Sequence, residues 1–251
     1  MKERREAIRK FIEVNGDVTI GQLCEKFANW SEMTIRRDLD YLAKSRIVIL
    51  TRGGARIMPS SYGVSEDIYS EREKRHAEAK QRIAEKAAGL VELGTGIFID
   101  SGTTGMALAR TLPDYQMVVV ASGPNIALEI ALKKSRPSVI LLGGAISRHS
   151  MAVMDPDIGG QLANLNIDTA FVATSGFDGK AGFSVGNQSD ALLKRSVIAR
   201  ARRVVMMMDS SKVGAMLPFT FARPQDVDIL ITDDEMPENV KRELSDIFTV
   251  L

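Results

Sequence analysis

Short apolar runs alternate with helical patterns from about His76 onward, and this alternation restricts the possible folds more than any other feature of the sequence. Strands that are apolar on both faces are typical of a parallel sheet covered by helices on both sides. We therefore expect residues 76–251 to form a mainly parallel α/β domain. Its predicted strands are 97–100, 117–121, 139–142, 169–174, 204–208 and 227–232.

One strand end has the composition of an anion-binding loop. After the strand that ends at Asp100, the sequence continues Ser101-Gly102-Thr103-Thr104 and enters a predicted helix. Backbone N–H groups at a helix start bind anions, and the hydroxyl groups add further donors. A plain capped turn is the alternative. Because no Gly-Lys-[Ser/Thr] follows, a phosphate on a small molecule fits the loop better than a nucleoside triphosphate.

Other predicted strands also end in polar or glycine-rich residues. Ligands of open parallel sheets bind outside the carboxyl ends of the strands, so we expect these loops to converge on one polar cleft. Carboxylates can accept hydrogen bonds from sugar hydroxyls, and lysines can bind phosphate. The predicted ligand-binding residues are Asp100, Ser101, Gly102, Thr103, Thr104, Ser122, Gly123, Gly143, Gly144, Ser175, Lys194, Asp209 and Lys212.

Composition excludes several classes of protein. An apolar content of 45% argues against a disordered chain. No stretch approaches roughly 18 apolar residues, and the N-terminus lacks the apolar core of a signal peptide, so we expect a cytoplasmic protein without a membrane partner. The single cysteine, Cys24, forms neither an internal disulfide nor a cysteine zinc cluster. Met206-Met207-Met208 is interpreted as core strand rather than a metal site, and no cofactor is expected.

Residues 1–58 differ in charge from the remainder of the chain, with +4 against −3. Thr51-Arg52-Gly53-Gly54 lies between two short apolar runs and predicts a β-hairpin. Before it, apolar spacing predicts three helices, over 2–14, 20–27 and 31–45. Three helices and a hairpin are the parts of a winged helix-turn-helix. We assign residues 1–58 to this domain and 59–75 to a linker. The charged stretch 66–75 is interpreted as a solvated connector or the start of a helix, and the alternative is a coupling element that carries effector binding to the DNA-binding domain.

The third predicted helix carries the residues best suited to bind DNA. Its N-terminus offers free N–H groups and the positive end of the helix dipole, both of which suit phosphate. Hydroxyls and arginines in its first turns can reach phosphates and base edges. The alternative is a solvated helix whose arginines pair with Asp38 and Asp40. The predicted DNA-binding residues, including two from the hairpin, are Ser31, Thr34, Arg36, Arg37, Arg52 and Arg56.

Two sets of motifs resemble a known family. Ser31-Glu-Met-Thr-Ile-Arg-Arg-Asp-Leu-Asp40, followed by Arg52-Gly-Gly-Ala55, is similar to the recognition helix and wing of the DeoR family of bacterial transcription regulators. The likeness continues through the larger domain at Asp100-Ser-Gly-Thr-Thr104, Gly143-Gly144 and Asp209-Ser-Ser-Lys212. It implies an effector domain similar in fold to ribose-5-phosphate isomerase and the CoA-transferase superfamily. It also implies a phosphorylated sugar or related metabolite as effector.

These features together predict a regulator rather than an enzyme. We expect a repressor of a carbohydrate-metabolism operon that binds double-stranded operator DNA as a homo-oligomer, a dimer or tetramer, and responds to a phosphorylated sugar. The alternative is an enzyme similar to sugar-phosphate isomerases. Asp100, Asp178, Lys194 and Lys212 include the carboxylates and amines that aldose–ketose proton transfer uses. The attached DNA-binding domain favours sensing, so no catalytic residue is predicted.

Overall fold

The computed structural model describes residues 2–44, 47–57, 69–134, 137–147 and 150–251. The chain divides into two compact units, Met1–Ser61 and Tyr62–Leu251. Residues 58–68, which include most of the predicted linker, lie outside the described part of the chain.

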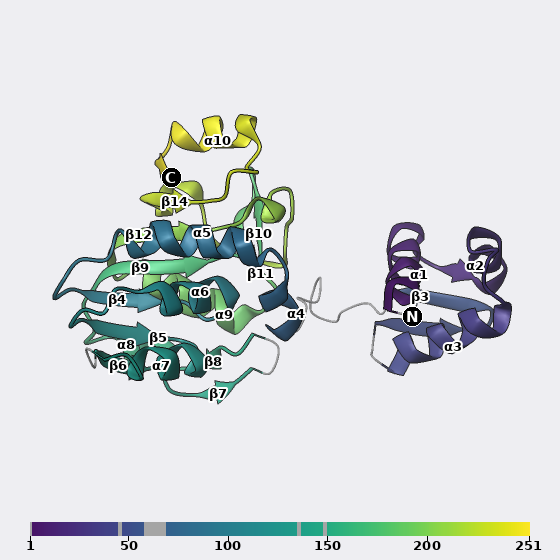
Figure 1. Cartoon of the computed structure of the whole chain (residues 1–251), viewed down its shortest axis with the longest axis horizontal. Helices are drawn as coiled ribbons and strands as arrows, with labels where there is room; N and C mark the ends of the chain where they lie inside the picture. The colour runs from purple at the N-terminus through teal and green to yellow at the C-terminus, as the bar shows by residue number, and fades with distance from the viewer. Residues whose placement is uncertain (1, 45–46, 58–68, 135–136, 148–149) are drawn as a thin grey trace. The chain divides into compact units, whose positions relative to one another are not determined.

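The smaller unit has the predicted helices and hairpin (Figure 1). Its core contains Ile8, Leu23, Ile35 and Val48, and each of these side chains is at most 1% exposed. Thr19 begins α2 with a capping box shared with Gln22, as its sequence position predicts. The elements are α1 (Lys2–Asn15), β1 (Val18–Thr19), α2 (Ile20–Lys26), α3 (Glu32–Lys44), β2 (Val48–Thr51) and β3 (Gly54–Ile57).

The short strand β1 was not predicted, and its position explains why residue 54 must be a glycine. β1 adds to the hairpin to give a sheet with the order β1-β3-β2, and Thr19 pairs with Gly54. A Cβ atom on Gly54 would lie 1.9 Å from the carbonyl oxygen of Val18. The glycine is therefore required by close backbone approach between β1 and β3.

Gly54→Ala is expected to displace β1 and to destabilise the smaller unit by about 1–3 kcal/mol, the usual cost of overpacking. Urea unfolding followed by the fluorescence of Trp30, the single tryptophan of the chain, measures this effect in the smaller unit. Gly53→Ala is the matched control, because a Cβ atom there meets nothing within 4 Å. Equal unfolding midpoints for the two variants would contradict the prediction.

The larger unit is built on a seven-stranded sheet in which every neighbouring pair of strands is parallel. This confirms the predicted mainly parallel α/β domain. The strand order is β15-β14-β12-β9-β4-β5-β6. The strands are β4 (Gly96–Ile99), β5 (Val118–Ala121), β6 (Ser138–Leu141), β9 (Ile167–Ala173), β12 (Ala201–Met207), β14 (Ile229–Ile231) and β15 (Thr249–Val250).

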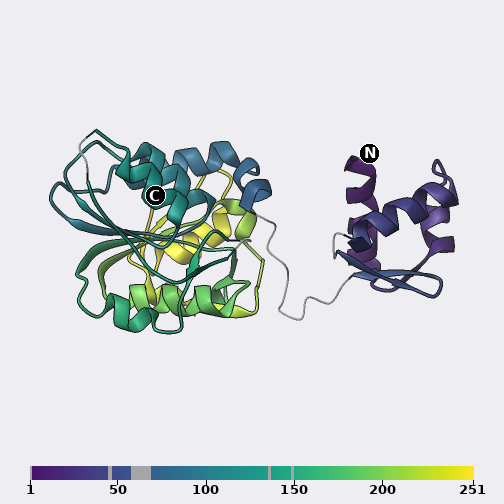
Figure 2. The same ribbon diagram turned by 90° about the horizontal axis from the view of Figure 1, so that it is seen from below.

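Helices cover both faces of this sheet, and alternate residues of each strand face them. Ile97 and Ile99 belong to the core cluster under one group of helices, whereas Phe98 belongs to the cluster on the other face. Figure 2 shows α5 (Ala77–Ala88), α6 (Thr103–Thr111) and α7 (Pro124–Ala131) on one side, with α8 (Ile158–Leu162) and α9 (Gln188–Ile198) on the other. The three methionines 206–208 are buried in this core, as interpreted from sequence.

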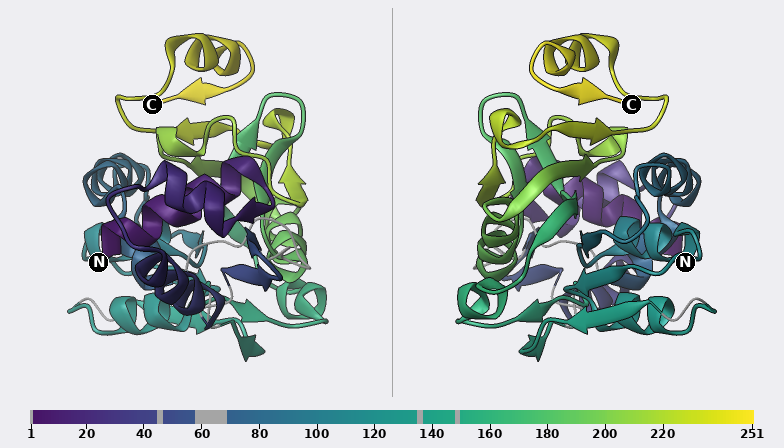
Figure 3. Two further views of the ribbon diagram at one scale, coloured as in Figure 1. Left: turned by 90° about the vertical axis from the view of Figure 1, so that its right-hand side faces the viewer. Right: turned by 90° about the vertical axis from the view of Figure 1, so that its left-hand side faces the viewer.

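Several parts of the larger unit were not predicted. β10 (Gly176–Asp178), β11 (Gly182–Val185) and β13 (Phe219–Ala222) form a small antiparallel sheet, and β7 (Ala145–Ile146) pairs with β8 (Val153–Met154). The charged stretch assigned to the linker, interpreted as a solvated connector or the start of a helix, contains a helix, α4 (Tyr69–Lys74). Figure 3 shows α10 (Glu238–Ser245) beside β15 at one edge of the main sheet.

Candidate functional site

The third helix of the smaller unit presents its predicted DNA-binding side chains to solvent. Ser31 begins α3, because its hydroxyl accepts a hydrogen bond from the Thr34 backbone N–H at 3.3 Å. Ile35 is fully buried in the core, and helical geometry then places Arg36 and Arg37 on the outer side, where both are exposed. This orientation is the one that contact with DNA requires.

Asp38 fixes the orientation of α3 from beneath. Its carboxylate is fully buried and accepts hydrogen bonds from the Nε atoms of Arg4 and Arg5 on α1, the latter at 2.9 Å. Burial alone would raise the pKa of Asp38, but the hydrogen bonds and charges of Arg4 and Arg5 outweigh it and lower the pKa. Asp38 therefore anchors α3 to α1 and does not neutralise the arginines on the outer face.

Arg36 and Arg37 do not form the ion pairs with Asp38 and Asp40 that the alternative interpretation of this helix predicted. Arg36 pairs with Glu32 one turn earlier, at 2.7 Å, and not with Asp38 or Asp40. Within the described part of the chain, Arg37 forms no ion pair. An exposed pair one turn apart is weak, so it leaves Arg36 available to an anionic partner.

Exposed arginines on the hairpin extend this basic surface. Arg52 lies in the turn between β2 and β3, and Arg56 lies on β3. Trp30, in contrast, packs inward, with its ring stacked on Phe27 at 4.7 Å between centroids. We use the name DNA-facing surface for the six residues that the sequence predicts to bind DNA: Ser31, Thr34, Arg36, Arg37, Arg52 and Arg56.

The larger unit contains a cavity of about 340 Å³ at the carboxyl ends of β4 and β9. The strand order reverses between these two strands, since the chain runs from β4 outward to β6 and then returns to β9 on the other side of β4. Such reversal points leave a crevice in which α/β proteins bind ligands. Of the predicted ligand-binding residues, those that line the cavity are Asp100, Ser101, Gly102, Thr103, Thr104, Ser175, Lys194 and Lys212.

The loop from Ser101 to Thr104 places a helix N-terminus at the cavity. Gly102 has a φ of +107°, a conformation that favours glycine, and no side chain caps α6 behind it. Gly105 brings the first turn of α6 against the loop, because a Cβ atom there would lie 2.0 Å from the Asp100 carbonyl oxygen. The first N–H groups of α6 and the hydroxyls of Thr103 and Thr104 are thus positioned for an anion.

A buried ion pair forms the floor of the cavity. The carboxylate of Asp100 is fully buried and accepts hydrogen bonds through Oδ2 from the Lys194 ammonium and from the Ala173 backbone N–H, the latter at 3.0 Å. Lys194 also donates to the Ala173 carbonyl at 3.1 Å and lies 3.6 Å from Asp190. Among the described residues, nothing donates to Oδ1 of Asp100, which leaves an acceptor beside the cavity.

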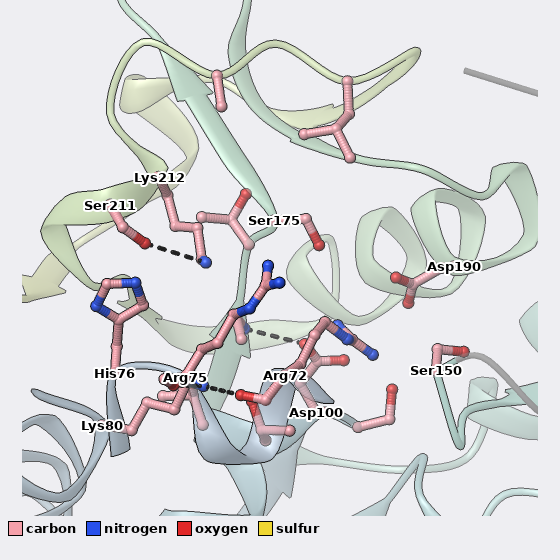
Figure 4. A pocket seen from close by; sticks show the side chains of 18 of the residues that line it. Arg72, Arg75, His76, Lys80, Asp100, Ser150, Ser175, Asp190, Ser211 and Lys212 are labelled. Carbon is pink, nitrogen blue, oxygen red and sulfur yellow. Dashed lines mark hydrogen bonds between the residues drawn. The ribbon is translucent and has the colours of Figure 1, made fainter. Parts of the chain in front are cut away.

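Sequence reasoning missed one wall of the cavity, which comes from α4 and the residues after it. Figure 4 shows Arg72, Arg75 and Lys80 on this wall, with Lys212 across from them. Burial lowers the pKa of Lys80 to about 8, so its ammonium form still predominates at neutral pH. Five lining side chains carry cationic groups and two carry carboxylates, which makes the cavity electropositive: Arg72, Arg75, Lys80, Lys194 and Lys212 against Asp100 and Asp190.

Five predicted ligand-binding residues do not line the cavity. Ser122 is fully buried and accepts the Ser101 backbone N–H at 2.8 Å, so it supports the loop from behind. Gly123 lies beside it, where a Cβ atom would be 3.4 Å from that of Ser101. The backbone of Gly143 pairs with the Gln161 side chain, and Gly144 lies against β8. Asp209 begins a short helix and lies 3.7 Å from the Lys212 ammonium.

The enzyme alternative depends on Asp178, and the structure places this residue elsewhere. Asp178 accepts hydrogen bonds from the Lys180 and Ala181 backbone N–H groups, both at 2.9 Å, in the turn between β10 and β11. These bonds lower the pKa of its carboxyl group. It is not among the residues that line the cavity.

Comparison with protein-family models matches both units. A model of the DeoR C terminal sensor domain matches residues 75–234, and a model of the DeoR-like helix-turn-helix domain matches residues 4–61. The chain belongs to the DeoR family. It is therefore a DNA-binding transcriptional regulator, which confirms the prediction made from its recognition helix and loop motifs. No helix among the described residues has the length and apolar character needed to cross a membrane.

Curated relatives of this DeoR-family chain match along almost its full length. An uncharacterized HTH-type transcriptional regulator of Bacillus subtilis, YulB, is 33% identical over 95% of this chain and 92% of its own. The transcriptional repressor GlcR of the same organism is 30% identical over 92% and 88% of the two chains. The glycerol-3-phosphate regulon repressor of Escherichia coli is 28% identical over 97% and 95%.

Ribose 5-phosphate isomerases are among the solved structures that this chain resembles. Ribose 5-phosphate isomerase A from Methanocaldococcus jannaschii has a TM-score of 0.40 and 16% identity, covering 55% of this chain and 54% of its own.

Proposed function

We propose that this regulator is a repressor whose operator affinity is controlled by a phosphorylated sugar or a related anionic metabolite bound in the cavity. The observation that carries the proposal is the cavity itself, in which an uncapped helix N-terminus and several cationic side chains face a buried acceptor, Asp100 Oδ1. A phosphate group suits the helix N-terminus and the cations, and a sugar hydroxyl suits the carboxylate. A relative named as a glycerol-3-phosphate regulon repressor supports the assignment of a phosphorylated metabolite as ligand.

Control of DNA binding requires that the ligand distinguish two states of the protein. Ligand binding changes operator affinity only if the two conformations bind the ligand with different affinities. We propose that the bound form has the lower operator affinity. We also propose that the chain acts as a homo-oligomer, because paired recognition helices read repeated half-sites whose spacing follows the symmetry of the protein.

We further propose that the cavity binds its ligand without converting it. Of the four groups that the isomerase alternative requires, Asp178 does not line the cavity, and Asp100 is held in a buried pair with Lys194. Incubating purified protein with sugar phosphates and analysing the products by NMR tests this point. Turnover that is lost in Lys194→Met would favour the enzyme.

A thermal-shift screen of phosphorylated sugars tests the binding proposal. A ligand present at about 100 times its Kd stabilises the native state by about 2.7 kcal/mol and raises the melting temperature by about 5 °C or more. The same sugars without phosphate are expected to give no shift, because the helix N-terminus and the cations then lack their partner.

Two variants of α6 test whether the ligand binds at the loop from Ser101 to Thr104 or elsewhere along the helix. Thr103→Ala/Thr104→Ala removes two hydroxyls at the cavity and is expected to reduce the shift by at least about half, since hydrogen bonds to charged groups contribute about 1.5–3 kcal/mol each. Thr111→Ala, at the far end of the same helix, is expected to keep the full shift, because its hydroxyl donates to the Ala107 carbonyl. Equal shifts in the wild type and the double variant would overturn the assignment of the phosphate to this loop.

A further inference from the structure

The wall of the cavity that sequence reasoning missed makes polar contacts with the rest of its unit. We call residues 69–76 the α4 segment, which comprises α4 and the turn that leads into α5. No residue of α4 is buried. An isolated helix of six residues is not stable in water, so the position of this segment depends on the contacts that dock it.

Polar contacts connect the α4 segment to α5, α6 and α7. The Tyr69 hydroxyl accepts a hydrogen bond from Asn125 Nδ2 at 2.8 Å, at the start of α7. Glu73 pairs with Arg110 on α6 at 3.1 Å. The buried Lys80 ammonium donates to the backbone carbonyls of Arg72 and, at 2.6 Å, Arg75. All of these contacts are polar and can be broken at a small net cost, because water replaces the partners.

The docked segment brings like charges together. Arg72 and Arg75 extend from it into the cavity, and Figure 4 shows Arg75 and Lys212 pointing toward one another from opposite sides. Cations that converge in this way repel one another when no anion lies between them, and an anion reverses the sign of the interaction. The docked position is therefore stabilised more strongly when the cavity holds an anion than when it is empty.

We propose that the α4 segment is the movable half of the anion site, in which Arg72 and Arg75 bind the ligand from one side while the loop from Ser101 to Thr104 binds it from the other. Ligand binding and docking of the α4 segment are then a single coupled equilibrium. This inference rests on the proposed function, and it adds the residues that connect occupancy of the cavity to the rest of the chain.

The position of the α4 segment in the sequence links ligand binding to the DNA-binding unit. It is the first described part of the larger unit, and it follows the DNA-binding unit along the chain after residues 58–68. A ligand that fixes the α4 segment therefore acts close in sequence to the point where the larger unit is joined to the DNA-binding unit. In this proposal, ligand binding affects the DNA-binding unit without any change in the main sheet.

Hydrogen exchange of the full-length chain in a titration of inorganic phosphate tests the proposal, with chloride at equal ionic strength as the reference. Phosphate is expected to slow exchange in residues 69–76 and in residues 101–106 with the same concentration dependence. Protection of residues 101–106 alone would contradict the proposal that the α4 segment docks when the ligand binds, and it would still support the proposed phosphate site. Protection of neither would overturn both.

Substitution of the arginines tests whether they contact the anion. Arg72→Gln/Arg75→Gln is expected to weaken phosphate binding by about tenfold or more, as the loss of two charge-assisted contacts implies. Lys74→Gln is the matched control, because Lys74 lies on the same helix and does not line this cavity. Equal phosphate affinities in the double variant and the control would overturn the role of the arginines.

A residue outside the cavity tests the coupling itself. Tyr69→Phe removes the hydrogen bond to Asn125 without changing a residue that lines the cavity. Because docking and binding are coupled, this variant is expected to exchange faster in residues 69–76 and to bind phosphate about three- to tenfold more weakly. Faster exchange with unchanged phosphate affinity would show that docking and binding are independent, and so would overturn the coupling.

Discussion

Replacing Arg36 and Arg37 together by alanine is expected to lower operator affinity by about two orders of magnitude, since each DNA-contacting arginine contributes about 1–3 kcal/mol. Both side chains are exposed on the outer side of α3, while Ile35 and Asp38 hold the inner side in the core. The double variant should therefore fold normally. Fluorescence anisotropy with operator DNA, obtained by selection in vitro with the wild-type chain, gives the affinity.

The salt dependence of this binding separates the kinds of contact. Each lost phosphate contact is expected to reduce the slope of log K against log salt by about 1, whereas a lost base contact changes sequence preference instead. Arg37→Lys keeps the charge and loses the bidentate geometry, so it should retain the slope and lose discrimination if Arg37 reads a guanine.

A matched control removes the same charge from the larger unit. Arg82→Ala/Arg202→Ala deletes two exposed arginines, and operator affinity is expected to change little, because their charges lie outside the DNA-facing surface. An unchanged affinity and salt slope in Arg36→Ala/Arg37→Ala would refute the assignment of α3 as the recognition helix.

Lys194→Met is expected to destabilise the larger unit by about 3–5 kcal/mol, the usual cost of leaving one member of a buried ion pair without its partner. Lys194 is 2% exposed and Asp100 is fully buried, so the substitution leaves a buried carboxylate without the cation that pairs with it. Asp100→Asn/Lys194→Met should recover much of this loss, because the buried charge is then absent while the asparagine oxygen still accepts the Ala173 N–H.

Two spectroscopic signals distinguish unfolding of the larger unit from unfolding of the smaller unit. Far-UV circular dichroism during urea unfolding reports mainly the larger unit, and Trp30 fluorescence reports the smaller one. Only the circular dichroism midpoint is expected to fall. Lys180→Met, at an exposed position, should change stability by less than about 0.5 kcal/mol. A Lys194→Met midpoint equal to that of Lys180→Met would show that the pair is not a structural requirement.

The conformations of α3 and of the loop from Ser101 to Thr104 were predictable because their determinants are close together in sequence. Ser31 caps the helix that it precedes, and the position of Ile35 in the helical repeat decides that Arg36 and Arg37 face outward. The loop after β4 is likewise a local arrangement, in which a strand end, glycines and a helix start follow one another. Elements of this kind need no knowledge of distant parts of the chain.

Charge pattern alone did not identify every residue that lines the cavity. Arg72 and Arg75 line it, yet they lie in a highly charged stretch for which a solvated connector or the start of a helix was the favoured interpretation. Ser122, in contrast, follows a strand end as a ligand-binding residue would, yet its hydroxyl accepts a backbone N–H from Ser101. The same side chain can serve a ligand or a loop, and only its neighbours in space decide between them.

By itself, the sequence determined the two units, the parallel sheet, the outward arginines of α3 and the loop beside Asp100, because helical and strand periodicity decide which face of each element is buried. The tertiary structure decided that the order of strands reverses between β4 and β9, that Lys194 meets Asp100, and that the α4 segment covers the cavity. These are contacts between residues far apart in the chain. Their geometry depends on how complete helices and strands pack together, which no local pattern specifies.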